Sequence, residues 1–403
     1  MIEKRKRSPA YAQEKQWQAE ADNSCQMKMQ TYRKPESGIS KETVLNISKS
    51  DDQKMIRTIE YRISRADLPE QGPGPTVNEY LRKRAYSRHL MTYLRHHEDT
   101  LTVNGRSVFT NCHLAEGDVV RITFTDEVRS VGIIPVPLPL DICYEDEDIL
   151  VVNKPPFLPI QPSLGHPERT LGNAVAAYYE GQGIPFVYRC VNRLDRNTSG
   201  LTIIAKNMAS SAILYDQMKS REIHRTYLAV VHGRLEAAVY REEESGSGVC
   251  MSCAEGETGT IDLPIARRQV SLIERCVDFE KGQRSVTHYR RVTGEMASGV
   301  FAGCQIPEDW EGYDSEKDLT AVAVQLETGR THQIRVHMSY IGHPLVGDTL
   351  YGESMRDYMI RQALHSWKLD FIHPVSRSRM HLEAPLPEDM RQLFMQSKNR
   401  LQL

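Results

Sequence analysis

One short stretch of the chain places a carboxylate in a basic turn. Residues 191–201 read VNRLDRNTSGL, so Asp195 stands between Arg193 and Arg196 and ahead of a turn-forming Asn-Thr-Ser-Gly sequence. Residues 201–205, LTIIA, predict a buried strand, which puts Asp195 on the tight loop that enters it. A carboxylate held there can act as a nucleophile or base, or it can simply accept hydrogen bonds from its own turn. Taken alone, the stretch favours the second interpretation.

A second segment could contribute an aromatic side chain to the same chemistry. Residues 224–233, HRTYLAVVHG, alternate as a strand, and one face carries Arg225, Tyr227, Ala229 and Val231. Tyrosine at such a position is more often a core or rim aromatic than a catalyst. Further partners must therefore decide its role.

A third segment brings several hydrogen-bond donors together. Residues 321–344, AVAVQLETGRTHQIRVHMSYIGHP, predict a strand, a turn and a helix that ends at Gly342 and Pro344. Three polar side chains fall on one side of the helix: His332, Arg335 and Ser339. Arg330 and Arg335 could simply be exposed, but so many donors at a strand-to-helix junction favour an anion or a carboxylate as their partner.

Two short helices nearer the start of the chain carry charge of one sign. Thr76 and Ser87 are placed to cap helices that run to Arg84 and His97. The basic residues of this run are Arg82, Lys83, Arg84, Arg88 and Arg95. Such a run is often only a solvated face. Because this one lies on two adjacent helices without an intervening acid, it favours binding to a phosphate backbone.

The residues after these helices predict a β-hairpin. LTVNGRSV and AEGDVVRITF read as strands, and Asn104-Gly105 is a strong hairpin turn. Two basic helices followed by this hairpin resemble the S-four domain, a small RNA-binding domain, with YSRHL and VNG as the most similar pieces. A glycine that usually precedes the VNG strand is replaced by the Glu98-Asp99 region. The resemblance implies a small α/β RNA-binding domain over residues 56–127.

Several longer motifs, in chain order, resemble the RluA family of RNA pseudouridine synthases. They are YEDEDILVVNKP, RLDRNTSGL, RTYLAVVHG, LETGRTHQIRVHMSYIGHPLVGDTLYG, and ALHSWKLDFIHP with LEAPLP. The resemblance covers about residues 141–392, and several long motifs in the right order are far more specific than one pattern. It implies an α+β pseudouridine synthase fold: a mixed, largely antiparallel sheet with flanking helices and a central cleft.

The resemblance also implies an activity and assigns residues to it. In this family a uridine in RNA is isomerised without a cofactor: the bond from ribose to the base nitrogen breaks, the uracil turns, and a carbon-carbon bond forms. Asp195 matches the catalytic aspartate, which starts cleavage by attack or by removal of a ribose proton. Tyr227 matches the tyrosine that packs on the base and is placed to take the proton from carbon five. Arg335 matches the arginine that pairs with the aspartate.

A stacked uracil must be extruded from folded RNA, so the site also needs a positive rim and an apolar or aromatic wall. Arg193, Arg196 and Arg330 are candidates for the rim. Leu201 and Leu326 are candidates for the wall, although each suits the core at least as well.

Three positions depart from the family pattern. Asn192 stands where a histidine commonly precedes the RLD arginine, Arg225 where a lysine often precedes the tyrosine, and Gln161 in an early loop where histidine is frequent. None of them is the aspartate, the tyrosine or the paired arginine. We therefore expect the chemistry to survive, and substrate choice or the hydrogen bonding of the loop to differ.

The 403 residues predict more than one domain. Beyond the two regions above, we expect a polar, disordered tail at 1–55, a Pro-containing linker at 128–140, surface insertions at 236–259 and 294–318, and a second tail at 393–403. Cys250 and Cys253 form one CxxC motif without a second ligand pair, so a loop coincidence is the better interpretation than a metal site.

Composition narrows the class of protein. Hydrophobic residues make up 40% and charged residues 26% of the chain, which is typical of a globular protein. No apolar run approaches the length of a membrane span, and no secretory signal is apparent. We expect a cytoplasmic monomer that binds ribosomal RNA, or alternatively transfer RNA, and needs no metal or other cofactor.

Two other classes compete with an active synthase. One is an RNA-binding or ribosome-assembly factor that kept the fold and lost turnover, but the aspartate, tyrosine and arginine are all present. The other is a nucleoside hydrolase of the glycosidase kind, which would generally need two carboxylates flanking the bond. Only Asp195 sits in a motif that indicates such a site.

Overall fold

A computed structural model gives the structure of most of the chain. It describes residues 55–97, 99–126, 130, 132–163, 165–236, 238–242, 248–252, 258–271, 273–301, 310–352 and 358–394. The predicted tail at 1–55 lies outside the described residues except for Met55, and the tail at 393–403 does so from residue 395 on. Cys253 of the CxxC motif is also outside them. Among the described residues, none of the helices combines the length and the apolar character needed to cross a membrane.

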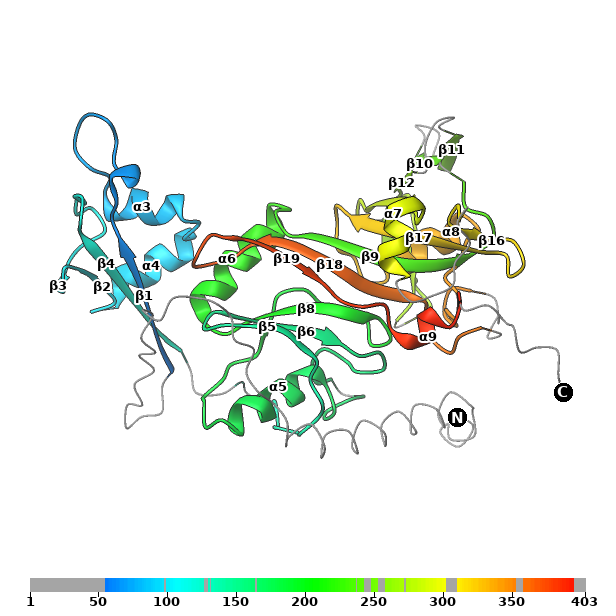
Figure 1. Ribbon diagram of the computed structural model, residues 1–403, viewed down its shortest axis with the longest axis horizontal. Coiled ribbons are helices and arrows are strands. Elements are labelled where there is room, and N and C mark those ends of the chain that lie inside the picture. The colour runs from blue at the N-terminus through cyan, green and yellow to red at the C-terminus, as the bar shows by residue number, and fades with distance from the viewer. Residues whose placement is uncertain are drawn as a thin grey trace.

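The first unit is a four-stranded antiparallel sheet covered by two helices, at the left of Figure 1. Its strands lie in the order β1 (Met55–Arg62), β4 (Val119–Asp126), β2 (Leu101–Val103) and β3 (Arg106–Ser107), and its helices are α3 (Val77–Lys83) and α4 (Arg88–His96), with a short 3-10 turn at Arg65–Asp67. Apolar side chains from both layers form a shared core, including Ile59, Leu81, Leu90 and Ile122.

The predicted signals of this unit are confirmed in detail. The Thr76 hydroxyl accepts the backbone N–H of Glu79, and the Glu79 carboxylate accepts the N–H of Thr76, so the first helix begins with a capping box. Ser87 caps the second helix by accepting the N–H of Leu90. The hairpin turn has positive φ at both central residues, 50° at Asn104 and 77° at Gly105, as a two-residue hairpin of this type requires.

The second unit is built on one large sheet, in which thirteen strands of the described residues are joined. The main path runs β11-β10-β12-β15-β17-β9-β18-β8-β6-β5, while β16, β19 and β7 pair with β17, β18 and β8. Among the described strands, only β8 with β18 and β10 with β12 pair in parallel, so the sheet is mixed and largely antiparallel, as predicted.

The strands have these bounds: β5 Ile142–Glu145, β6 Ile149–Lys154, β7 Arg189–Cys190, β8 Ser199–Ala205, β9 His224–His232, β10 Ala238–Glu242, β11 Gly248–Ser252, β12 Thr258–Asp262, β15 Val286–Arg291, β16 Tyr313–Asp314, β17 Leu319–Leu326, β18 Leu364–Ile372 and β19 Arg379–Glu383. A separate hairpin is formed by β13 (Ile265–Arg267) and β14 (Arg275–Val277).

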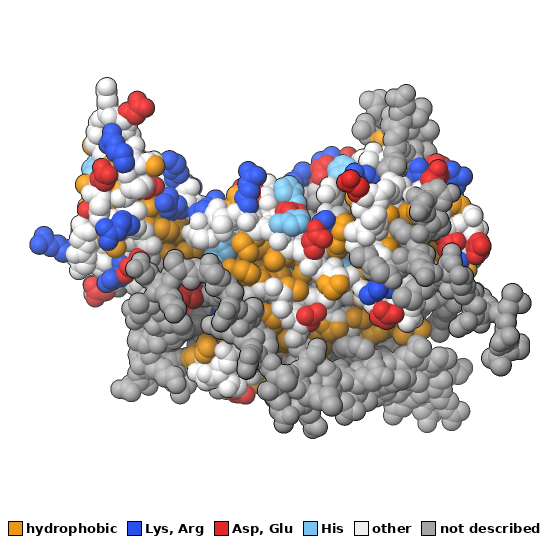
Figure 2. All heavy atoms as spheres, viewed as in Figure 1, with side chains coloured by type: hydrophobic (Ala, Val, Ile, Leu, Met, Phe, Trp, Pro, Cys, Tyr) orange, Lys and Arg blue, Asp and Glu red, His pale blue; other side chains and the backbone are white. Residues whose placement is uncertain are grey.

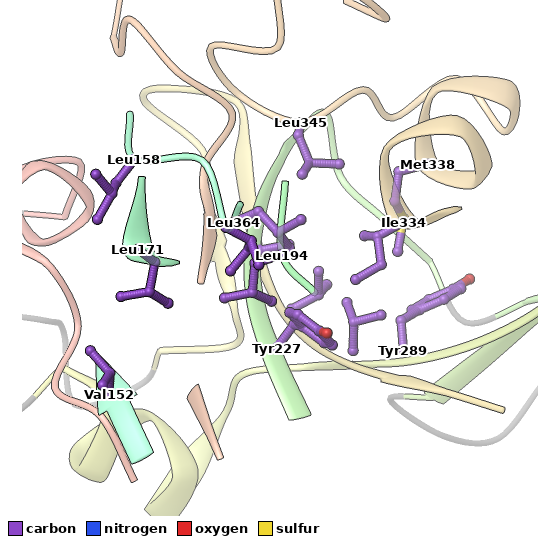
Figure 3. Packing of buried hydrophobic residues seen from close by; sticks show 14 of the residues in the cluster. Val152, Leu158, Leu171, Leu194, Tyr227, Tyr289, Ile334, Met338, Leu345 and Leu364 are labelled. Atoms are coloured by element: carbon purple, nitrogen blue, oxygen red, sulfur yellow. The ribbon is translucent and has the colours of Figure 1, made fainter. Parts of the chain in front are cut away.

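Helices cover both faces of this sheet. They are α5 (Leu171–Glu180), α6 (Met208–Lys219), α7 (Gly294–Val300), α8 (Gln333–Tyr340) and α9 (Glu388–Arg391). On one face α5 and α8 pack against side chains such as Tyr227 and Val231, and Figure 3 shows this cluster. On the other face α7 and α9 pack against Leu228 and Val230. Because β9 is buried on both faces, residues 227–231 of the strand are all buried hydrophobic residues.

The two segments predicted as surface insertions are parts of the fold. Within 236–259, β10 and β11 extend the edge of the large sheet through β12. Within 294–318, α7 and β16 appear, and Phe301 and Trp310 pack edge to face with ring centroids 5.9 Å apart. The predicted surface insertions thus contain strands and a helix in their described parts.

The segment predicted as a linker, 128–140, lies against the second unit where it is described. The backbone N–H of Val136 donates to the carbonyl of Asn173 on α5, and Leu138 and Leu140 pack on the core. Asn173 also donates to the carbonyl of Ile134. The segment is therefore attached along its path.

The two units share side chains at their junction. Ala209 and Ile213 of α6 belong to the core of the first unit, which places α6 between the units in Figure 1. Arg57 of β1 reaches across to Asp148 with two hydrogen bonds of 3.0 and 2.8 Å. Asp126 at the end of β4 accepts a hydrogen bond of 2.7 Å from Arg189. Apolar packing and buried ion pairs together fix the first unit on the second.

We expect Arg57→Met to destabilise the protein because it leaves Asp148, whose side chain is 5% exposed, without its charged partner. Loss of one partner of a buried ion pair should cost about 3 kcal/mol in free energy of unfolding. The control is Arg121→Met, which breaks a pair with Glu60 whose side chains are both half exposed, and should cost at most about 1 kcal/mol. Denaturant unfolding measures both, and equal losses would contradict the junction described here.

Candidate active site

A cleft lies on one face of the large sheet, and its lining comes from β17, β9 and β18, the loop before β8, and α8 with the turn that precedes it. Its empty volume is about 450 Å³. The lining residues are Arg193, Leu194, Asp195, Thr198, Arg225, Tyr227, Leu326, Gly329, Arg330, His332, Gln333, Ile334, Arg335 and Leu364. All three residues that the resemblance assigned to catalysis are among them. The fold thus brings together side chains that are up to 140 positions apart.

Asp195 presents its carboxylate into the cleft from a tight turn. The turn is closed by a hydrogen bond of 3.1 Å from the Thr198 N–H to the Asp195 carbonyl. Arg335 Nη1 donates to Asp195 Oδ2 at 3.3 Å. Among the described residues no hydrogen-bond donor is placed on Oδ1. One oxygen of the carboxylate is therefore anchored, and the other is available to a substrate.

Asn192 holds the start of this loop against β8. It is buried, and its side-chain amide donates to the carbonyl of Leu201 at 3.1 Å and accepts the N–H of Ile203 at 2.7 Å. The amide thus pairs with β8 much as another strand would. Asn192, which replaces the histidine common in the family, thus gives the loop two hydrogen bonds to β8.

Two buried cations hold the carbonyl groups that follow Asp195. Lys154 Nζ donates to the Arg196 carbonyl at 3.1 Å, and also to two carbonyls of the segment that follows β6, at 2.8 and 2.9 Å. Burial lowers the pKa of Lys154 and so disfavours its charged form. The three carbonyl acceptors favour the charged form, because an ammonium has three N–H groups to donate. Arg361 donates to the Asn197 carbonyl at 3.2 Å and forms two hydrogen bonds with Asp389.

Glycine is required where the Asp195 loop enters β8. Gly200 has a φ of +110°, and a Cβ there would lie 2.2 Å from the carbonyl oxygen of Ser366 on β18. No other residue type fits this close approach of two parallel strands. The glycine of the RLDRNTSGL motif thus lets the loop end where β8 and β18 approach closely.

Arg335 is itself held by a second carboxylate. Its Nε and Nη2 donate to Asp348 at 2.6 and 2.8 Å, and the Asp348 side chain is fully buried. Asp348 also accepts the backbone N–H groups of Leu350 and Tyr351. Burial acts to lower the pKa of Arg335, but Asp348 and Asp195 outweigh it and raise that pKa. The arginine is therefore a fixed cation between two carboxylates.

Tyr227 forms part of an apolar wall. It is 4% exposed, and Arg225 Nη1 lies 3.5 Å from its hydroxyl oxygen. Figure 3 shows its ring near Leu194, Leu364 and Ile334, which come from the loop, β18 and α8 and also line the cleft. Of the two leucines considered for the wall, Leu326 lines the cleft. Leu201 belongs to a core cluster on the opposite face of the sheet.

The predicted RNA-contacting arginines near the cleft take different positions. Arg193 and Arg330 are exposed and line the cleft, so they lie at its rim. Arg196 is half-buried and does not line it. Gln161 is exposed and also lies away from the lining.

The predicted RNA-contacting residues of the first unit also differ in their exposure to solvent. Arg82, Lys83, Arg88 and Arg95 are exposed. Arg84 instead packs inward: its guanidinium lies 4.1 Å from the ring centroid of Tyr80 and pairs with Asp67 at 3.3 Å. Arg84 thus has a structural role within the unit, and its contact with RNA stays a prediction.

One group of side chains has the spacing of a metal site. Among the described residues, Asp146, Asp148 and His373 alone are close enough to share an ion. Their ligand atoms are already engaged, since His373 Nε2 lies 2.7 Å from Asp146 Oδ2 and Arg57 occupies both oxygens of Asp148. The group fits the ion-pair network at the junction of the two units.

The supporting residues were not identified from the sequence. Asp348 and Tyr351 stand in the quoted LVGDTLYG motif and Lys154 in VVNKP, but neither motif says which atoms they meet. For Asp348, the sequence signal was an acidic residue within a motif that also contains glycines and a tyrosine. Arg361 lies in no motif and had no signal.

Comparison with known proteins identifies the family. A family model described as RNA pseudouridylate synthase matches residues 148–340. The Uncharacterized RNA pseudouridine synthase YjbO of Bacillus subtilis (strain 168) is 41% identical over 319 residues, 79% of this chain and 98% of that protein. The Ribosomal large subunit pseudouridine synthase D of Escherichia coli O6:H1 is 37% identical over 276 residues, 64% of this chain and 71% of that protein. The solved structure of Human RNA Pseudouridylate Synthase Domain Containing 1 is 27% identical and covers 61% of this chain and 83% of that one, with a TM-score of 0.44.

The family match includes the cleft residues from Arg193 to Arg335 and most strands of the large sheet. One sequence relative is matched along nearly its whole length at an identity well above that of chance similarity. The same residues form one mixed sheet with a cleft at its centre. The chain belongs to the RNA pseudouridine synthases, isomerases that convert uridine within RNA to pseudouridine.

Proposed function

We propose that this protein isomerises specific uridines of large-subunit ribosomal RNA, and that Asp195 breaks the bond between ribose and uracil. The observation that carries the proposal is the geometry of the cleft. A carboxylate has one oxygen paired with Arg335 and the other unpaired among the described residues, and it stands beside the ring of Tyr227. A cytoplasmic location and a monomeric state belong to the same proposal.

The anchored carboxylate suits the first step by either of two routes. Asp195 Oδ1 can attack the ribose carbon C1′ while the bond to N1 breaks, or it can take a proton from C2′ as the base leaves. After the uracil turns, carbon C5 bonds to C1′, and the carboxylate leaves or the proton returns to C2′. The proton on C5 is lost and N1 ends protonated, so atoms balance in both routes. Tyr227 would pack on the base and take the C5 proton.

The rim of the cleft suits an extruded nucleotide. Arg193 and Arg330 are exposed, line the cleft and can each contact a backbone phosphate. The apolar wall of Leu194, Ile334 and Leu364 offers a surface for the base once it leaves its stack. Charge at the rim and apolar contact inside are the combination that base extrusion requires.

The first unit supplies a second basic surface, in an S-four-like role. Its exposed cations are Arg82, Lys83, Arg88 and Arg95. Figure 2 shows Lys and Arg side chains over this unit and along the concave upper edge that leads to the large sheet. Phe109, 86% exposed, follows β3 on the same unit and offers a ring on which an unpaired base can stack. This surface would add affinity and orient the RNA.

The choice of large-subunit ribosomal RNA rests on relatives. The proteins from Escherichia coli O6:H1 and Xylella fastidiosa, at 37% and 34% identity, are both named Ribosomal large subunit pseudouridine synthase D. Transfer RNA is the other substrate class to be tested. Mapping all pseudouridines in the cell distinguishes the two.

Deletion of the gene should remove one or more pseudouridines from large-subunit ribosomal RNA, as mapped by carbodiimide sequencing of total RNA. The wild-type gene should restore them, and Asp195→Asn should not, because the neutral amide can neither attack C1′ nor take a proton. The matched control is Asp216→Asn, an acid on α6 away from the cleft lining, which should restore them fully. Restoration by Asp195→Asn, or no lost site, would contradict the proposed chemistry; loss only from transfer RNA would overturn the substrate.

The variant Lys83→Gln with Arg88→Gln should bind RNA more weakly and with a shallower salt dependence. Each lost phosphate contact should reduce the slope of log affinity against log salt by about 0.7 to 0.9. Fluorescence titration at several salt concentrations measures this. The control is Arg62→Gln with Arg121→Gln, on the face of the small sheet opposite the helices, which should keep the wild-type slope. Equal slopes for the two variants would exclude the helices from the RNA surface.

A further inference from the structure

His332 lies beside Asp195 in an unusual backbone conformation. It precedes α8 with φ of 60° and ψ of 18°, in the left-handed region that non-glycine residues rarely adopt. Its side chain is 14% exposed, and its Nε2 lies 3.9 Å from Asp195 Oδ2. Backbone strain of this kind persists at sites where the surrounding structure must aim a side chain. Here the side chain is aimed at the anchored oxygen of Asp195.

Hydrogen bonds to Tyr351 determine which nitrogen of His332 carries the proton. The backbone N–H of Arg275 donates to the Tyr351 hydroxyl oxygen at 2.8 Å, and the same hydroxyl lies 2.8 Å from His332 Nδ1. Among the described residues, His332 Nδ1 is the one acceptor found for the hydroxyl proton, which favours donation of this proton to Nδ1. A neutral imidazole whose Nδ1 accepts a hydrogen bond carries its proton on Nε2. This is the nitrogen that faces Asp195.

The surroundings also favour the neutral ring. Burial lowers the pKa of His332, and Arg335 and Arg275 act in the same direction, against Asp195 and Asp348. Because the net shift is downward from an ordinary value near 6.5, the ring is mostly uncharged at neutral pH. His332 therefore offers Asp195 a hydrogen-bond donor that brings no charge.

We propose that His332 is a positioning residue whose Nε2–H donates to Asp195 Oδ2 when a uridine occupies the cleft, and that Tyr351 sets the tautomer this requires. The inference rests on the proposed role of Asp195. A separation of 3.9 Å is too long for a hydrogen bond, but such bonds are often long without substrate and shorten in the complex. With Arg335 and His332 both on Oδ2, Oδ1 is the oxygen left to face the ribose.

The kinetic test uses Tyr351→Phe, which removes the hydroxyl and keeps the ring that packs under Arg335. We expect the single-turnover rate to fall about tenfold, with RNA affinity unchanged. His332→Gln, which can still offer an N–H, should retain more of the rate than His332→Ala. The control is Tyr340→Phe, an exposed tyrosine at the end of the same helix, which should keep the wild-type rate. Wild-type rates for both Tyr351→Phe and His332→Ala would overturn the proposal.

The spectroscopic test reads the tautomer directly. In protein with ¹⁵N-labelled histidine, the nitrogen shifts of His332, assigned with His332→Gln, should show the proton on Nε2 at neutral pH. In Tyr351→Phe the proton should shift toward Nδ1, a change that a purely structural role of Tyr351 would not produce. A proton on Nδ1 in the wild type, or a charged ring, would overturn the proposal. The spectrum needs no turnover, so an inactive wild-type enzyme would refute the proposed function separately.

Discussion

The site depends on one buried arginine that joins two carboxylates. Asp348 takes Nε and Nη2 of Arg335, and the remaining Nη1 meets Asp195 Oδ2. Because a guanidinium is planar and rigid, fixing two of its nitrogens fixes the direction of the third. Asp348, which does not line the cleft, therefore sets the direction of the free Asp195 oxygen through Arg335. Removing either acid would leave the buried cation with an incomplete set of partners, which is costly.

The rest of the fold keeps the Asp195 loop where this arginine can reach it. Asn192 pairs with the backbone of β8 before the aspartate, and Lys154 and Arg361 hold the carbonyls after it. Lys154 ends β6, Asn192 bonds to β8 and Arg361 lies just before β18, so the loop is held at three places along the large sheet. The first unit is in turn fixed to the sheet through α6 and Arg57. A basic surface on that unit therefore has a defined position relative to the cleft.

Local signals in the sequence were sufficient for individual elements, whereas the three central residues were singled out only by the resemblance of several long motifs to a known family. The caps at Thr76 and Ser87 and the period-two pattern of β9 depend on residues close in the chain, and the structure confirms them. The place of segment 236–259 at the sheet edge depends on pairing between distant strands, which no local pattern contains. The same holds for Arg84: its contacts with Tyr80 and Asp67 arise from tertiary packing, and its charge alone suggested RNA.

The most direct test of this account is the single-turnover rate of Asp348→Asn. The substituted amide would turn an N–H group toward Arg335 at one of the two oxygen positions, so the guanidinium could no longer be held by both. If Asp348 directs Arg335, and Arg335 directs Asp195, the rate should fall by about 100-fold while the fold and the affinity for RNA are retained. A folded Asp348→Asn protein that isomerises uridine at the wild-type rate would contradict it.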